Sequence, residues 1–277
     1  MNGKLMVVED EEEIRSMMVR VLRSKGYEVL EVSGFHEALT LMGRERVDMV
    51  ISDISMPDGS GVELGKAVKK RWPETGVALM TGRHSEKQVI EAIRSGADFY
   101  LKKPLTEDDL LETVQNMAEL RSETARIGIH EARPGWYEFV ITSSEDAIAK
   151  LQSFLDALLK DILNEERFWD VKFSISELGR NAVEWGNRFD IESVVKLSIG
   201  ITDSAVTIKI EDEGDGFDVK GTLETIEEMP CPDQQEKRMA ESKRPGGLGI
   251  RVIRETADRI IFNEKGNMVV LQFRVGE

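Results

Sequence analysis

The stretch VISDISMPDGSG (residues 50–61) decides how the first half of the chain folds. It contains most of an apolar segment of strand length, Met49–Ser52, and places the carboxylate of Asp53 at the end of that strand. Pro, Asp, Gly and Ser, which are typical of turns, follow at once. A segment with helical spacing, Gly61–Arg71, begins directly after them. We therefore expect a buried strand, an acidic loop and a helix in immediate succession.

The same succession occurs on both sides of this stretch. Further strands are expected at Lys4–Val8, Glu28–Val32, Val77–Met80 and Phe99–Leu101. Further helices are expected at Ile14–Lys25, Phe35–Gly43, Glu86–Ser95 and Glu107–Arg121. Strands that alternate with helices predict an α/β domain built on a doubly wound, parallel, five-stranded sheet with helices on both faces.

Ligands of such a sheet bind beyond the carboxyl ends of its strands. The residues expected there are Glu9, Asp10, Asp53, Thr81 and Lys103. Each of them alone is more often a solvated loop residue, but their coincidence at one edge favours a site. Three carboxylates suit Mg²⁺, and a metal-bound carboxylate beside a lysine and a hydroxyl suits an aspartyl-phosphate.

Four segments, LMVVEDE, VISDISMPDGSGVEL, ALMTG and ADFYLKKPL, occur in the order found in the receiver domains of response regulators. The chain resembles that family over Lys4–Arg121, which implies a flavodoxin-like fold. The resemblance implies that Asp53 accepts a phosphoryl group from an upstream histidine kinase. It also implies that Glu9 and Asp10 hold Mg²⁺, with the backbone carbonyl of Ser55 as a further ligand.

The same resemblance assigns three more residues of the first half. Lys103, which precedes Pro104, would pair with the phosphoryl group, and Thr81 would be the switch hydroxyl. Tyr100 would be the aromatic residue that changes rotamer with it. The alternative for Tyr100, an aromatic side chain that simply fills the end of a strand, stays open.

The alternating pattern ends after residue 121. Residues 122–135 (SETARIGIHEARPG) are expected to be a linker between a domain at 1–121 and a domain at 136–277. The strands expected in the second domain are Trp136–Thr142, Val194–Thr202, Ala205–Glu211, Ile260–Asn263 and Met268–Val275. The helices expected are Glu145–Leu163, Asp170–Trp185 and Leu248–Asp258. Long helices combined with antiparallel strands predict an α+β sandwich.

Three segments of the second domain carry candidate chemistry. In SELGRNAVEW (176–185), Glu177 and Asn181 are four residues apart and share a helix face, where they can place a general base beside an oxygen ligand for Mg²⁺. In DEGDG (212–216), Asp212 can accept a hydrogen bond from an amino group such as that of adenine. The third segment, PGGLG (245–249), opens a helix and can offer backbone N–H groups to phosphates. The glycines concerned are Gly214, Gly216, Gly247 and Gly249.

Singly, these glycine-rich segments are more often turns or hairpin loops. In this order and spacing they resemble the GHKL (Bergerat) ATP-binding fold over Trp136–Glu277. The resemblance implies that Asn181 coordinates Mg²⁺, that Glu177 polarises an attacking hydroxyl and that Asp212 reads adenine. It also implies that the backbone of Gly247–Gly249 holds phosphates and that residues 218–245 form a lid over ATP.

Within that group, the leading strand, the long helix and SELGRNAVEWGN resemble the anti-sigma-factor serine/threonine kinases (RsbW-like). The expected output is then phosphorylation of a STAS-type antagonist protein, or release of a sigma factor, under control of the receiver. Trp185 stands where that group often has His, which favours a rival interpretation: a non-catalytic module that binds ATP and sequesters its partner. A third interpretation is an atypical histidine kinase, which would phosphorylate His130 or a histidine of another chain. Pro134-Gly135, close after His130, leave no room for a helical hairpin.

Composition limits the remaining classes. The 277 residues carry a net charge of −15 and one cysteine, which disfavours nucleic acids and anionic membranes as partners and excludes a disulfide framework. The N-terminus does not resemble a signal peptide and no apolar run reaches membrane length, so we expect a cytoplasmic protein. An apolar stripe is expected either to pack on the first domain or to pair two chains in a homodimer, and its residues are Leu110, Leu111, Val114, Met117 and Leu120.

Overall fold

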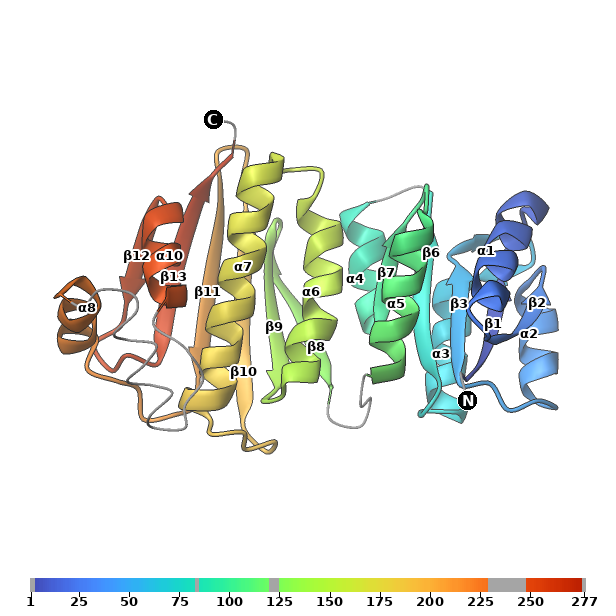
Figure 1. Cartoon of the computed structure of the whole chain (residues 1–277), viewed down its shortest axis with the longest axis horizontal. Helices are drawn as coiled ribbons and strands as arrows, with labels where there is room; N and C mark the ends of the chain where they lie inside the picture. Colours follow the sequence, from blue (N-terminus) through green and yellow to red (C-terminus); the bar gives the residue numbers. More distant parts are fainter. Residues whose placement is uncertain (1–2, 83–84, 120–124, 229–247, 276–277) are drawn as a thin grey trace. The chain divides into compact units, whose positions relative to one another are not determined.

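The computed structural model describes residues 3–82, 85–119, 125–228 and 248–275. The chain forms two compact units, which are mainly residues 1–127 and residues 128–277, and each is described by itself (Figure 1). Among the described residues, none of the helices combines the length and the apolar character needed to cross a bilayer.

The first unit is built on a parallel five-stranded sheet of order β2-β1-β3-β6-β7. The strands are β1 (Lys4–Val8), β2 (Glu28–Val32), β3 (Met49–Asp53), β6 (Gly76–Thr81) and β7 (Phe99–Lys102). Asp53 pairs in register with Met80, and Thr81 with Lys102. The carboxyl ends of three neighbouring strands therefore lie level at one edge of the sheet.

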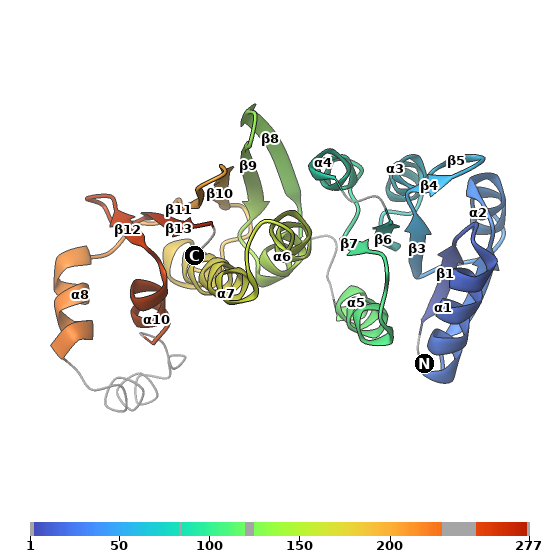
Figure 2. The same ribbon diagram turned by 90° about the horizontal axis from the view of Figure 1, so that it is seen from above.

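Five helices cover the two faces of this sheet. They are α1 (Glu12–Ser24), α2 (Phe35–Met42), α3 (Gly61–Arg71), α4 (Glu86–Arg94) and α5 (Glu107–Glu119). Figure 2 shows α1 and α5 on one face and α2, α3 and α4 on the other. The Oγ atoms of Ser60 and Ser85 accept hydrogen bonds from backbone N–H groups in the first turns of α3 and α4, which fixes where both helices begin. The predicted doubly wound fold is confirmed.

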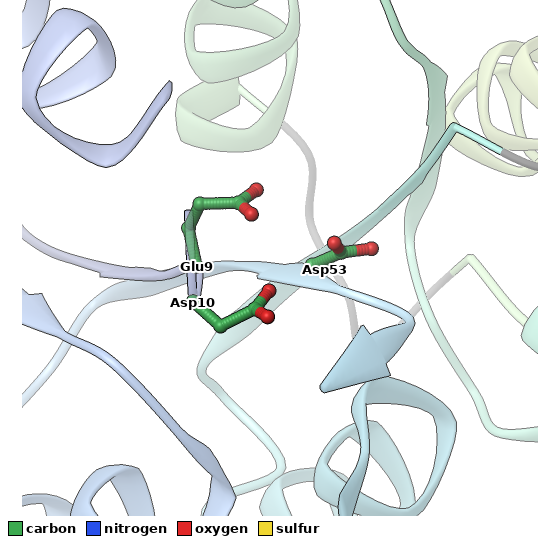
Figure 3. A group of neighbouring side chains, drawn as sticks. All are labelled: Glu9, Asp10 and Asp53. Atoms are coloured by element: carbon green, nitrogen blue, oxygen red, sulfur yellow. The ribbon is translucent and has the colours of Figure 1, made fainter. Parts of the chain in front are cut away.

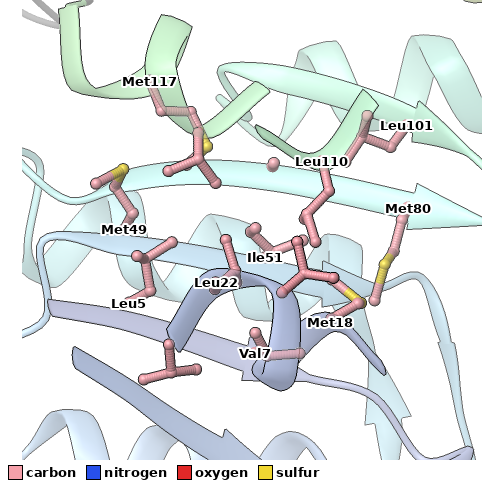
Figure 4. Close-up of a cluster of buried hydrophobic side chains, with 14 of the residues drawn as sticks. Leu5, Val7, Met18, Leu22, Met49, Ile51, Met80, Leu101, Leu110 and Met117 are labelled. Atoms are coloured by element: carbon pink, nitrogen blue, oxygen red, sulfur yellow. The ribbon is translucent and has the colours of Figure 1, made fainter. Parts of the chain in front are cut away.

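The core between α1, α5 and the sheet is made mostly of aliphatic and methionine side chains, together with Phe99 (Figure 4). Leu110, Val114 and Met117 of α5 belong to it and are buried. The apolar stripe of this helix therefore packs on its own unit. Leu111 is half-buried against the same core, and Leu120 lies outside the described residues.

A two-stranded ribbon that the sequence analysis did not predict lies within the loop after Asp53. Its strands are β4 (Ser55–Met56) and β5 (Gly59–Ser60). Asp58, at its tip, accepts hydrogen bonds from the backbone N–H groups of Phe35 (2.9 Å) and His36 (3.1 Å). The ribbon thereby ties the loop to the first turn of α2.

The second unit is a two-layer α+β sandwich, as predicted. Its six-stranded sheet has the order β12-β13-β11-β10-β9-β8, and the strand pairs from β9 to β12 are antiparallel. The strands are β8 (Ile127–Arg133), β9 (Trp136–Thr142), β10 (Val194–Ile201), β11 (Ala205–Asp212), β12 (Arg259–Phe262) and β13 (Met268–Arg274). The helices are α6 (Glu145–Leu159), α7 (Glu165–Asn181), α8 (Val219–Glu228) and α10 (Leu248–Thr256), with a π-helical turn at Ala182–Gly186. Figure 2 shows α6, α7 and α10 on one face of the sheet.

Residues 127–133 correct the expected linker at 122–135. They form β8, which pairs with β9 at the edge of the sheet. Most residues of β8 are exposed. An exposed edge strand does not need the alternation of apolar and polar residues by which a half-buried strand is recognised. Its polar sequence therefore concealed a strand. His130 lies on this exposed strand, where it is not part of a helical hairpin.

Two other differences concern helix bounds. The helix expected at Asp170–Trp185 begins five residues earlier, at Glu165, because the side chain of Asn164 accepts a hydrogen bond from the N–H of Arg167 and caps it. A helix that was not predicted, α8, also occupies Val219–Glu228, within the stretch expected to form the lid.

Replacing Leu110 with alanine tests the described core. Because Leu110 is fully buried between α5 and the sheet, the substitution should destabilise the first unit by about 2–5 kcal/mol. Hydrogen exchange of the β1 and β3 amides in the full chain measures this loss. Gln115→Ala, at an exposed position of the same helix, is the matched control and should cost less than about 0.5 kcal/mol. Equal losses in both variants would contradict the assigned core.

Candidate functional site

Three carboxylates converge at the carboxyl edge of the parallel sheet (Figure 3). Glu9 and Asp10 follow β1, and Asp53 is the last residue of β3. One oxygen of each lies within 4.8 Å of the others, with Glu9 and Asp53 buried and Asp10 exposed. The set thus joins buried oxygen ligands to one open to solvent, which fits a hard cation that keeps some of its water.

Lys103 holds two of these carboxylates together. Its Nζ lies 2.7 Å from Oδ2 of Asp53 and 2.6 Å from Oε2 of Glu9. Burial raises the pKa of Glu9, and the ion pair with Lys103 opposes that effect. Burial alone would lower the pKa of Lys103, but its contacts with Asp53 and Glu9 outweigh this and raise it. The lysine therefore stays charged and offsets part of the negative charge of the cluster.

The remaining predicted residues of the first unit lie on or beside the same edge. Thr81 ends β6 and is almost fully buried, opposite Lys102 in the register. Tyr100, on β7, is also buried, and burial raises the pKa of its hydroxyl. The backbone N–H of Ser55 donates to Oδ1 of Asp53 over 3.2 Å, so the loop after β3 folds back onto the carboxylate. The switch roles of Thr81 and Tyr100 stay predictions.

In the second unit, Glu177 and Asn181 occupy the last turn of α7. Oε2 of Glu177 lies 3.0 Å from a guanidinium nitrogen of Arg180. A Cβ atom on Gly249 would collide with the side chain of Glu177, so only glycine allows the first turn of α10 to approach it this closely. A π-helical turn follows Asn181 at once, a feature that is frequent at functional sites.

The glycine-rich segment after β11 lies against that π-helical turn. A Cβ atom on Gly186 would collide with the carboxyl group of Asp212, and one on Gly214 would collide with the carbonyl of Gly186. The N–H of Gly214 donates to Oδ1 of Asp212 over 2.9 Å, while burial raises the pKa of this carboxyl. Gly216 has φ +78° and lies under the carbonyl of Lys265. The described parts of the three predicted segments thus meet at one end of α7.

Two asparagines that the sequence analysis did not single out hold this arrangement. Buried Asn187 donates from Nδ2 to the carbonyl of Val194 and accepts at Oδ1 from the N–H of Glu213, both over 2.9 Å. Asn267 donates from Nδ2 to the carbonyl of Asp212 over 2.7 Å. Asparagine is common in ordinary turns, so only the tertiary contacts distinguish these two. Gly247 and residues 229–245 of the expected lid lie outside the described residues.

Comparison with known families assigns both units. The model of the response regulator receiver domain matches residues 5–115, and that of the histidine kinase-like ATPase domain matches residues 141–273. The chain joins a receiver domain to a histidine kinase-like ATPase domain. Both expected families are thereby confirmed at the level of the domain.

Similar proteins align with the receiver domain. The response regulator protein PilR of Pseudomonas aeruginosa is 33% identical over 122 residues, which are 44% of this chain and 27% of PilR. The uncharacterized transcriptional regulatory protein YrkP of Bacillus subtilis is 35% identical over 121 residues, 44% of this chain and 51% of YrkP. The chain thus spans about a quarter to a half of the length of these curated relatives. The chemotaxis response regulator CheY4 of Vibrio cholerae, a solved structure, is 33% identical, with a TM-score of 0.41, and the match covers 42% of this chain and 99% of CheY4.

The carboxylate cluster of the receiver domain has the chemistry of a Mg²⁺ site. Asp10→Asn removes the exposed ligand and leaves the Lys103 contacts in place. It should weaken Mg²⁺ binding roughly tenfold, because affinity for hard cations depends on the number of charged ligands. Titration calorimetry with MgCl₂ in the absence of ATP measures this. Asp108→Asn, an exposed carboxylate at the start of α5, is the control. Unchanged binding in Asp10→Asn would remove Asp10 from the ligand set.

Proposed function

We propose that the chain is a two-component response regulator whose receiver domain controls an ATP-dependent serine/threonine kinase output. The observation that carries this proposal is the presence of two complementary sites in one chain. One is a carboxylate cluster that Lys103 binds. The other combines the close approach of Gly249 to Glu177 with that of Asp212 to Gly186, on the turn after the same helix. The first suits phosphoryl acceptance and the second suits phosphoryl donation from ATP.

In the receiver domain, a carboxylate oxygen of Asp53 would attack the phosphorus of a phosphohistidine on an upstream histidine kinase. The O–P bond forms as the N–P bond breaks, and the imidazole leaves. Mg²⁺ held by Glu9, Asp10, Asp53 and the carbonyl of Ser55 would neutralise phosphoryl oxygens. Lys103 already contacts Asp53 at 2.7 Å, so its ammonium group is placed to pair with the phosphoryl group that forms there.

The signal would then reach the output through buried groups at the same edge. Thr81 would donate its hydroxyl to the phosphoryl group, and Tyr100 would change rotamer in response. Both side chains are buried in the described structure, so their movement requires repacking of β6 and β7. Such repacking gives the receiver domain two discrete states rather than a continuous range.

In the ATPase domain, Asp212 would accept a hydrogen bond from the amino group of adenine, and Asn181 would hold Mg²⁺. Backbone N–H groups of Gly247–Gly249 would bind the phosphates at the start of α10. Glu177 would take the proton of a serine or threonine hydroxyl as its oxygen attacks the γ-phosphorus, and ADP would leave. The substrate would be a STAS-type antagonist protein, with a sigma factor as the alternative partner.

A second candidate function rests on Trp185. This side chain is exposed on the π-helical turn between Asn181 and Asp212, at the position where histidine is frequent in the RsbW-like group. A tryptophan cannot exchange a proton there. The domain would then hold ATP without turnover and act by sequestering its partner. An atypical histidine kinase is less favoured, because His130 lies on an exposed edge strand.

Acetyl phosphate tests the receiver step. The full chain with Mg²⁺ should incorporate one acid-stable, base-labile phosphoryl group, and Asp53→Asn should incorporate none, because the acceptor oxygen is lost. Phosphate-affinity electrophoresis measures the modified fraction. Asp48→Asn, an aspartate outside the carboxylate cluster, should be modified like the wild type. Modification that survives in Asp53→Asn would overturn the assignment of the phosphoacceptor.

Labelled ATP tests the output. With a STAS-type antagonist present, the wild-type chain should transfer label to a serine or threonine, and Glu177→Gln should lower the rate about 10²-fold or more while it still binds ATP. Glu184→Gln, a glutamate on the following turn, is the control. Binding of ATP without transfer to any candidate protein would favour the sequestration module, and label on His130 would favour the histidine kinase.

A further inference from the structure

Arg167 connects the two helices of the nucleotide site at the end opposite to Glu177. It lies in the first turn of α7, and its N–H donates to the capping side chain of Asn164 over 2.8 Å. One guanidinium nitrogen donates to the carbonyl of Thr256, the last residue of α10, over 2.6 Å. A cation that binds a carbonyl at a helix C-terminus also interacts favourably with the helix dipole.

The same guanidinium makes two further contacts. It lies 3.4 Å from Oδ1 of Asp258, at the start of β12, and 3.7 Å from Oδ2 of Asp170, one turn further along α7. Asp258 in turn accepts a hydrogen bond from the N–H of Arg274, on β13, over 2.8 Å. Only about a fifth of the Arg167 side chain is exposed. The arginine therefore joins α7, α10 and the adjoining strands, and it is largely shielded from solvent.

The two ends of α10 are thus both fixed on α7. Gly249, in its first turn, lies against Glu177, and Thr256, its last residue, binds Arg167. Arg167 and Glu177 are ten residues apart, about 15 Å along α7, so the helices run antiparallel with a contact near each end. Ile253, in the middle of α10, is fully buried, so loss of the contact at the C-terminal end would let the helix tilt about this point. A misplacement of about 1 Å is costly at a reacting centre.

We propose that Arg167 is a positioning residue for the nucleotide phosphates. By binding the C-terminus of α10, it fixes the position of this helix along α7. The backbone N–H groups in the first turn of α10 are thereby placed relative to Glu177 and Asn181. Because Arg167 lies about 15 Å along α7 from Glu177, it would act without contact to the phosphates. The inference rests on the proposed binding of ATP, and it adds a residue outside the three segments that carry the family resemblance.

The test compares ATP with adenosine, which has the base but no phosphates. In the full chain, Arg167→Ala should weaken ATP binding about fivefold to tenfold, the effect of one lost charge-assisted hydrogen bond, and should change adenosine binding less than twofold. Arg167→Lys, whose ammonium group can still donate to Thr256, should lie between. Calorimetry for ATP and NMR titration for adenosine give the affinities, and near-ultraviolet circular dichroism checks the fold.

Arg259→Ala is the matched control. Arg259 is an exposed arginine beside Asp258 and should bind both ligands like the wild type. If Arg167→Ala does not fold, Arg167→Lys alone must show the selective loss of ATP. Wild-type ATP affinity in the Arg167 variants, or equal losses for ATP and adenosine, would overturn the inference. A wild-type chain that binds no ATP would instead overturn the proposed function, and the inference with it.

Discussion

The ion pair of Lys103 with Glu9 and Asp53 is the interaction on which the receiver site depends. Two buried carboxylates at close range repel each other. The ammonium group of Lys103 pairs with both and offsets this repulsion without a bound metal ion. The arrangement is possible because parallel strands end level at one edge of the sheet, so that β1, β3 and β7 deliver these residues to one place. The order of strands in the sheet therefore determines that two carboxylates and one ammonium group lie in contact.

In the ATPase domain, close contacts at glycines bring the site residues together. Gly249 lies against Glu177, and Gly186 against Asp212, in both cases where a Cβ atom would collide. These approaches bring the start of α10 to Glu177 and the end of β11 to the π-helical turn. Asn187 and Asn267 fix the polar loops beside Asp212, and Arg167 binds the C-terminal end of α10. Acidic composition is compatible with phosphate binding here, because backbone N–H groups supply the positive potential.

Periodicity and turn chemistry predicted most of this architecture. The bounds of β1, α3 and β9 were predicted to the residue, because apolar strands and a capped helix leave clear signals. β8 was missed because an exposed edge strand has little alternation, and α8 because its sequence is polar. The motifs also indicated Asp53 and Glu177. The clamp by Arg167 was not predictable, because its partners, Thr256 and Asp258, are about ninety residues away and ordinary in type.

In the proposed function, the receiver domain controls the ATPase domain. Steady-state ATP affinity of the full chain, measured with and without acetyl phosphate in the wild type and in Asp53→Asn, probes that coupling. We expect phosphorylation to change the affinity severalfold in the wild type, a coupling of about 1 kcal/mol or more, and to have no effect in Asp53→Asn. Identical affinities in the phosphorylated and unphosphorylated wild-type chain, with modification of Asp53 verified, would contradict it.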